Sequence, residues 1–99
     1  MALSMKKTFA LQAPGKDAAR VRDKIRQEIN TYVRRVRRKD LPEGFDLLEF
    51  TCKVGLSLAT AETRSLKEVG AAIDSVAQTG AMEVYVEIVA APGTRKFAR

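Results

Sequence analysis

Histidine is absent from this 99-residue sequence, and cysteine occurs once, at Cys52. Histidine is the usual general base near neutral pH and the commonest metal ligand in proteins, so its absence removes the simplest routes to catalysis. A structural zinc site needs several cysteine and histidine ligands together, which one cysteine cannot supply. The single cysteine also excludes an internal disulfide and fits a reducing compartment.

Two catalytic motifs and a carboxylate pair are missing as well. The Pro-Gly-Lys stretch at 14–16 has neither the spacing of a phosphate-binding loop nor its following Ser or Thr. No Gly-x-Ser-x-Gly nucleophile elbow occurs. Glu83 and Glu87 would share one strand face but lie about 13 Å apart at ~3.3 Å per residue, too far to act as a pair. We therefore expect a protein that is not an enzyme and has no cofactor and no metal.

Long hydrophobic runs are also lacking. The most apolar segment, 84–91, carries Glu87 and is far too short to span a bilayer. The N-terminus has no apolar run of signal-peptide length. We expect a cytoplasmic protein without a membrane partner. Its length is that of a single domain, 1–99, in which residues 1–4 and 94–99 are expected to be flexible.

The apolar pattern predicts four strands and two helices. Alternation predicts strands over 6–13, 47–55 and 82–90, and a weaker pattern over 59–64 predicts a hairpin partner. Apolar residues spaced by three and four predict a long helix that opens at Asp17 and runs to about Lys39. A capping-box pattern at Ser65–Glu68 starts a second helix, and Gly80 follows it as a C-terminal cap.

This element order, β-α-β-β-α-β, predicts an α+β ferredoxin-like plait. Two helices would cover one face of a four-stranded antiparallel sheet and leave the other face open. Cys52 alternates with apolar residues of its strand and should point into the core. On the open face, Tyr85, Val89 and Ala10 could pair across a two-fold axis and form a homodimer interface.

Charge is distributed unevenly along the chain. Residues 14–39 hold ten basic and three acidic side chains, whereas residues 40–91 hold three basic and nine acidic ones. The chain is therefore a basic helix joined to an acidic remainder, with a basic tail. Five cations are consecutive except for one valine, and two more lie in the tail: Arg34, Arg35, Arg37, Arg38 and Lys39, then Arg95 and Lys96.

This basic run has three interpretations that the sequence leaves open. Cations at a helix C-terminus gain ~0.3–1 kcal/mol from the helix dipole, so the run fits a solvated helix end that pairs with acidic groups elsewhere. Four arginines chosen over lysines also favour planar, bidentate contact with phosphate, and no acidic residue lies between Asn30 and Lys39 to relieve their repulsion. An acidic protein partner or self-association is the third possibility.

Nucleic acid would bind the helical face and not the sheet. RNA-recognition domains stack bases on aromatic side chains of the open sheet face. Here that face would offer Tyr85 among carboxylates that repel phosphate: Glu49, Glu83 and Glu87. We hypothesise a polyanion- or nucleic-acid-binding module that uses the basic run and the tail. The alternative is a protein-interaction or homodimerisation module that uses the open sheet face.

Several stretches together resemble a known family. They are, in order, "KKTF", "YVRRVRRKDLPEG", "EFTCKVG", "AAID" and "YVEIVAAPGTR". This combination is similar to a family of short bacterial proteins of unknown function, over residues 5 to 96. The resemblance implies a bacterial, cytosolic origin and supplies no activity, ligand or catalytic residue.

Overall fold

The computed structural model describes residues 3–39, 41, 43–45 and 47–93. Its elements follow the expected order, with two short 3-10 turns added before β3 and before the second helix. The bounds are β1 Leu3–Ala10, α1 Ala18–Arg37, β2 Leu47–Gly55, β3 Glu62–Arg64, α2 Val69–Gln78 and β4 Glu83–Gly93.

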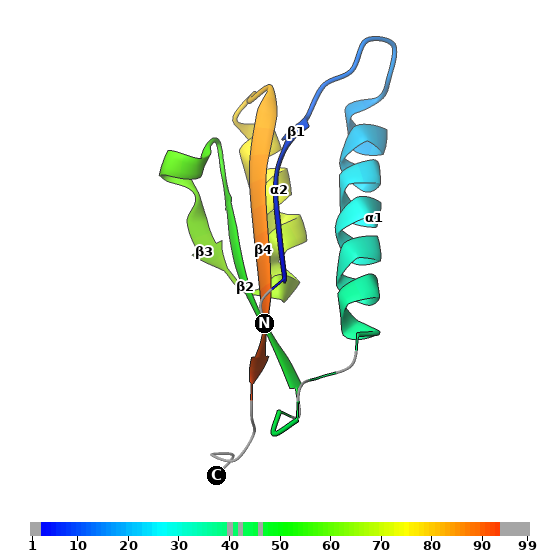
Figure 1. Cartoon of the computed structure of the whole chain (residues 1–99). Coiled ribbons are helices and arrows are strands. Elements are labelled where there is room, and N and C mark those ends of the chain that lie inside the picture. The colour runs from blue at the N-terminus through cyan, green and yellow to red at the C-terminus, as the bar shows by residue number, and fades with distance from the viewer. Residues whose placement is uncertain (1–2, 40, 42, 46, 94–99) are drawn as a thin grey trace.

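The four strands form one antiparallel sheet in the order β1-β4-β2-β3 (Figure 1). β1 and β2 therefore run in the same direction on either side of β4, and α1 connects them as a split β-α-β crossover. The fold class expected from the sequence is confirmed: α+β, with an open antiparallel sheet and two helices, consistent with a ferredoxin-like plait. Within the described residues, no helix is both long and apolar enough to cross a membrane.

Both helices pack on the same face of the sheet. The alternating residues Val84, Val86 and Ile88 of β4 are fully buried there, and Cys52 of β2 lies opposite Ile88. Each helix adds its apolar side to the same cluster, with Ile25, Ile29 and Val33 from α1 and Val69 and Ile73 from α2. The strand alternation and helical spacing seen in the sequence thus identify the core face correctly.

Helix α1 is fixed by a cap at each end. The Asp17 carboxylate accepts a hydrogen bond from Ala19 N at 3.3 Å, which satisfies one of the free amides of the first turn. The helix ends at Arg37, and the amide of Arg38 donates back to the carbonyl of Arg35 at 3.3 Å. This end lies two residues before the expected one, so Lys39 belongs to the turn that follows.

Helix α2 begins as its sequence pattern indicates. The Glu68 carboxylate accepts a hydrogen bond from Ser65 N at 2.9 Å, and this capping box precedes α2 as a single 3-10 turn. After the helix, Gly80 adopts a left-handed conformation with φ 83°, which glycine reaches without steric cost.

Three strands have bounds that differ from those expected, and one of them, β4, covers Glu83–Gly93 instead of 82–90. β1 covers Leu3–Ala10 instead of 6–13, because β4 offers partners as far as Ala90, which lies opposite Leu3. Leu11 leaves the ladder, and its amide donates to the carbonyl of Met82 at 2.8 Å. β3 is limited to Glu62–Arg64, because a 3-10 turn occupies the residues before it.

Met82 was expected to open the last strand, over 82–90, but that strand begins at Glu83. Met82 lies in the turn before β4, outside the strand alternation, and its side chain is 64% exposed. The structure describes only part of the two stretches, 1–4 and 94–99, that were expected to be flexible. Ser4 belongs to β1 and lies opposite Val89, whereas residues 1–2 and 94–99 are outside the described residues.

Candidate polyanion interface

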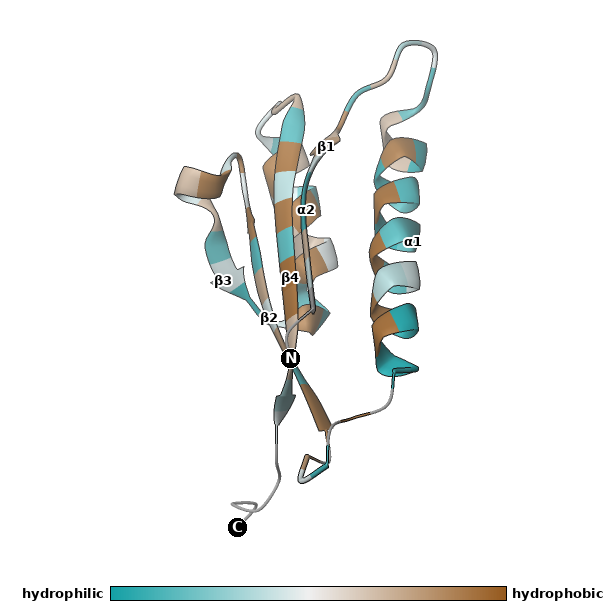
Figure 2. Cartoon of the chain, viewed as in Figure 1, coloured by the Kyte–Doolittle hydropathy of each residue, from teal (hydrophilic) through white to brown (hydrophobic). Residues whose placement is uncertain are grey.

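Helix α1 turns one polar side away from the sheet along its whole length. In Figure 2 its hydrophobic side points toward the strands and its hydrophilic side toward solvent, with no other element outside it. We call this surface the outward face. Its members lie within a stripe of about 100° around the helix axis, at 100° per residue. All seven are exposed: Arg20, Lys24, Gln27, Thr31, Arg34, Arg35 and Arg38.

The outward face contains five cations and no carboxylate. Two carboxylates of α1, Asp23 and Glu28, border it on either side, and each is engaged with a cation nearer the body of the protein. Asp23 Oδ1 lies 3.6 Å from Arg26 Nη1. Glu28 forms an ion pair with Lys7 of β1. In the described chain, none of the five outward cations forms an ion pair with a carboxylate.

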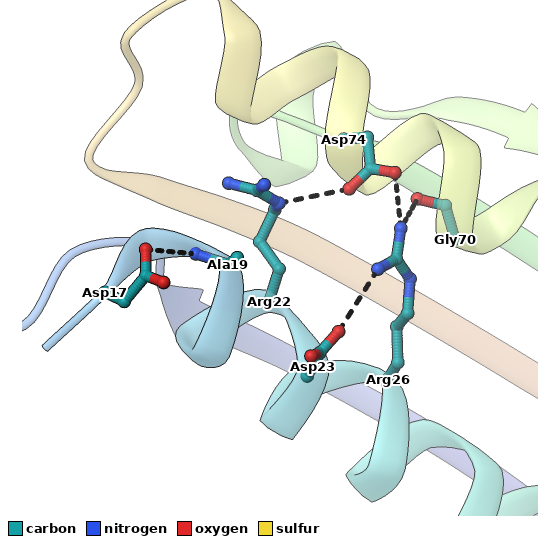
Figure 3. A network of polar contacts seen from close by, with 7 residues as sticks. All are labelled: Asp17, Ala19, Arg22, Asp23, Arg26, Gly70 and Asp74. Atoms are coloured by element: carbon teal, nitrogen blue, oxygen red, sulfur yellow. Dashed lines mark hydrogen bonds and ion pairs between the residues drawn. The ribbon is translucent and has the colours of Figure 1, made fainter.

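Two further cations of α1, Arg22 and Arg26, form contacts with α2 (Figure 3). Arg22 and Arg26 both reach Asp74 of α2, with Arg22 Nε 3.2 Å from Asp74 Oδ1 and Arg26 Nη2 hydrogen-bonded to Asp74 Oδ2. Arg26 also donates to the carbonyl of Gly70 at 3.4 Å. These contacts join the two helices. The sequence run 14–39 therefore contains cations that join the two helices, Arg22 and Arg26, as well as outward ones.

Three of the five cations in the predicted run lie on the outward face, namely Arg34, Arg35 and Arg38. Arg37 lies to one side of it, with its guanidinium 5.4 Å from the ring centroid of Phe50 in β2. That stacking covers an apolar ring and contributes a cation–π contact. Lys39 is exposed in the turn after the helix.

The two tail cations, Arg95 and Lys96, lie outside the described residues. The structure nevertheless defines the position of Gly93, after which the tail begins. Gly93, the last described residue, lies opposite Leu47 at the beginning of β2. Figure 1 places this end of β4 at the same end of the molecule as the C-terminus of α1.

A hollow of about 520 Å³ adjoins the outward face on the side of β1. Its lining includes the carboxylate of Glu28 and consists of Met5, Lys24, Gln27, Glu28, Thr31, Tyr32 and Arg35. The Tyr32 hydroxyl oxygen is buried and has no hydrogen-bond partner among the described residues, and burial raises the pKa of this phenol. On this side the outward face is therefore bordered by the Glu28 carboxylate as well as by Tyr32 and Met5.

The open sheet face differs from the expected interface in one respect. Tyr85 is only 7% exposed, although it lies on the face that no helix covers. Its neighbour in register on β2 is Gly55, which has no side chain, and its hydroxyl donates to Glu87 Oε1 at 2.8 Å. Val89 is half-buried and Ala10 is exposed at the end of β1. The homodimer hypothesis stays a prediction that now depends on Val89 and Ala10, because Tyr85 has little surface left to bury.

Charges on this sheet face alternate across the strands. Glu87 of β4 lies between Lys6 of β1 and Lys53 of β2 in the strand register. Among the described residues, this face has no exposed aromatic ring on which a base could stack, because Tyr85 is buried and its hydroxyl is bound to Glu87. The sheet face carries both signs of charge, whereas the outward face of α1 carries only cations.

Cys52 is completely buried, as expected, and burial raises the pKa of its thiol. The described residues bring together no group of three or more Cys, Asp or Glu side chains suited to a metal ion. The charged side chains of the described residues are distributed over the outer helix faces and the strands.

Fold and surface together define an open-faced α+β protein with a solvent-facing basic helix. Residues 5–98 match the family described as "Family of unknown function (DUF6172)", and the chain belongs to this family. No curated protein and no solved structure matches the chain.

Sequence reasoning missed most of the N-terminal half of the outward face. Lys24, Gln27 and Thr31 attracted no attention because each stands alone among other residue types. A helical projection of 18–38 would have found them, since all fall on the side opposite the buried stripe. The engagement of Asp23 and Glu28 with inward cations depends on tertiary placement and has no sequence signal.

Proposed function

We propose that this protein is a polyanion-binding module and that the outward face of α1 binds the phosphate backbone of nucleic acid. The observation that carries the proposal is the composition of that face: five exposed cations, two neutral polar side chains and no carboxylate. A merely solvated helix face usually mixes both signs of charge, which support each other at i and i+4. Here like charges accumulate, and a bound anion would relieve their repulsion.

Arginine suits this role because its planar guanidinium forms bidentate hydrogen bonds to phosphate. Four of the five outward cations are arginines: Arg20, Arg34, Arg35 and Arg38. A helix of 20 residues is about 30 Å long at 1.5 Å per residue, so the outward face spans several successive phosphates. Lys39 and the tail cations Arg95 and Lys96 would extend the contact at the C-terminal end of the helix.

We place this module in the bacterial cytoplasm, as the resemblance of its motifs to short bacterial proteins implies. Nucleic acid is available in that compartment. We propose binding and not catalysis as the activity, because the described residues present charge on an exposed, convex helix.

The test is fluorescence anisotropy of labelled DNA and RNA titrated with the protein at several salt concentrations. Binding to phosphates releases counterions, so log K is expected to fall linearly with log salt, with a slope of about −0.7 to −0.9 per neutralised phosphate. Arg34→Gln/Arg38→Gln removes two outward cations while keeping good helix-forming residues. It is expected to lower the slope by nearly two and weaken binding at every salt concentration.

The matched control is Lys6→Gln/Lys67→Gln, which removes the same net charge from exposed positions outside α1. If the outward face is the site, this control binds nearly as tightly as the wild type. Equal losses in the two variants would show that net charge alone attracts the polyanion. Absence of binding at low salt would overturn the proposal.

A further inference from the structure

The distribution of charge along α1 narrows the kind of nucleic acid that fits. The outward cations form two groups, one near each end of the helix: Arg20 and Lys24, then Arg34, Arg35 and Arg38. Between them the face is neutral, with Gln27 and Thr31 exposed. Lys24 and Arg34 are ten residues apart, so the neutral stretch covers about 15 Å at 1.5 Å per residue.

From this arrangement we infer that the outward face of α1 binds in the major groove of double-stranded DNA. The inference rests on the proposed function and specifies its ligand. The major groove of B-DNA is about 12 Å wide and admits an α-helix of 10–12 Å diameter. A helix that crosses it meets a phosphate backbone on each side, and the two cation groups are separated by a comparable distance.

The rest of the molecule leaves this approach open. Figure 1 shows α1 at the margin of the fold, beyond the β1 edge of the sheet, with its outer side unobstructed from end to end. Asp23 and Glu28, the carboxylates that border the outward face, are paired with Arg26 and Lys7. These ion pairs partly neutralise the negative charge beside the face, although the two side chains are 69% and 47% exposed.

Gln27 and Thr31 occupy the position of groups that read bases. Both are exposed at the middle of the outward face, where the floor of the groove would lie. A glutamine amide forms a bidentate pair with adenine, and a threonine offers a hydroxyl and a methyl group to base edges. The cations at the ends position the helix, whereas these two side chains contribute sequence preference.

Other nucleic acids fit this surface less well. The major groove of A-form RNA is deep and too narrow for a helix to enter. Single strands are usually held by bases stacked on aromatic rings, and the outward face has none among its seven residues. Of these nucleic acids, double-stranded DNA is the one that matches both the spacing of the two cation groups and the neutral side chains between them.

The experiment compares three labelled probes of one 20-base-pair sequence at equal salt: duplex DNA, duplex RNA and single-stranded DNA. Duplex DNA is expected to bind about tenfold more tightly than the other two. Equal or tighter binding of RNA duplex or single strands overturns the major-groove inference and leaves the proposed function standing. If none of the three probes binds, both the major-groove inference and the proposed function are overturned.

A second measurement tests the role of the neutral residues. Duplexes enriched by selection on the wild-type protein from a random-sequence pool are compared with the unselected pool. Gln27→Ala, which keeps a strong helix former, is expected to reduce the preference for enriched duplexes about tenfold while the salt slope stays unchanged. Unchanged preference in Gln27→Ala and in Thr31→Ala overturns base reading by these residues.

Discussion

At the scale of single residues, Gly55 allows the hairpin between β2 and β3 to close tightly. A Cβ atom at Gly55 would lie 2.6 Å from Ala61 Cα, closer than side-chain carbons approach backbone atoms. Gly55 also lies in register with Tyr85, so the tyrosine ring has no competing side chain beside it. The absence of a side chain at Gly55 therefore permits the close approach of the Ala61 and Thr60 backbone.

Gly55→Ala is expected to destabilise the protein by about 1–3 kcal/mol, because the backbone of Ala61 must move to make room. Urea unfolding followed by circular dichroism measures the loss. Gly70→Ala provides the contrast, since its Cβ would meet only the flexible Arg26 side chain at 3.3 Å and the helix interior favours alanine over glycine by about 0.5–1 kcal/mol. Equal destabilisation by both substitutions would contradict this account of Gly55.

Glu68 couples stability to pH. The backbone hydrogen bond from Ser65, followed by that residue's side chain, lowers the pKa of the Glu68 carboxyl below its ordinary value. A carboxyl with a lowered folded-state pKa stabilises the fold above the unfolded pKa of about 4.3, and this contribution disappears as the pH falls through the folded value.

Glu68→Gln is therefore expected to be less stable than the wild type at pH 7 and equally stable at strongly acidic pH. Thermal unfolding at intervals between pH 7 and pH 2 gives the comparison. A difference in melting temperature that stays constant over this range would show that the Glu68 charge does not contribute.

At the scale of elements, α1 and α2 are joined by the Asp74 carboxylate, which contacts Arg22 and Arg26 together. Asp74→Asn is expected to cost about 1 kcal/mol, because a partly exposed ion pair contributes modestly even where two arginines share it. It should also raise hydrogen-exchange rates in α1 more than in β4. Asp23→Asn, which removes one exposed partner of Arg26, serves as the control. It should change the free energy of unfolding and the hydrogen-exchange rates only slightly.

The elements themselves could largely be predicted from the sequence, whereas their contacts could not. The spacing from Val21 to Val36 identifies α1, because one apolar stripe must face the core whatever the topology. The start of β1 was predicted three residues late, because strand length depends on the partner that β4 provides. The Asp74 contacts required knowledge of how two helices distant in sequence lie side by side.

The candidate site was also predictable only in part, because local patterns are visible in the sequence whereas tertiary contacts are not. Arg34, Arg35 and Arg38 are adjacent in sequence and were recognised as a cluster. Tyr85 was predicted to be available on the open sheet face, and it lies on that face, but its side chain is only 7% exposed. Exposure depends on neighbouring strands, which no single stretch of sequence specifies.

At the scale of the whole molecule, ligand binding is expected to raise stability by mass action. A nucleic acid present at ten times its Kd stabilises the native state by about 1.4 kcal/mol, which raises the melting temperature of a domain of this size by about 5–10 °C. Arg34→Gln/Arg38→Gln should show a much smaller rise. A rise of equal size in the wild type and this variant would place the binding surface elsewhere.

The separation of the α1 cations from the carboxylates on the other elements gives the protein an electric dipole moment. The positive end lies along α1, while the acidic majority of residues 40–91 belongs largely to β2, β3, α2 and β4. In the field of a polyanion such a molecule rotates before contact, so encounters begin with α1 facing the ligand. Added salt would then slow the rate of association more than it shortens the lifetime of the complex.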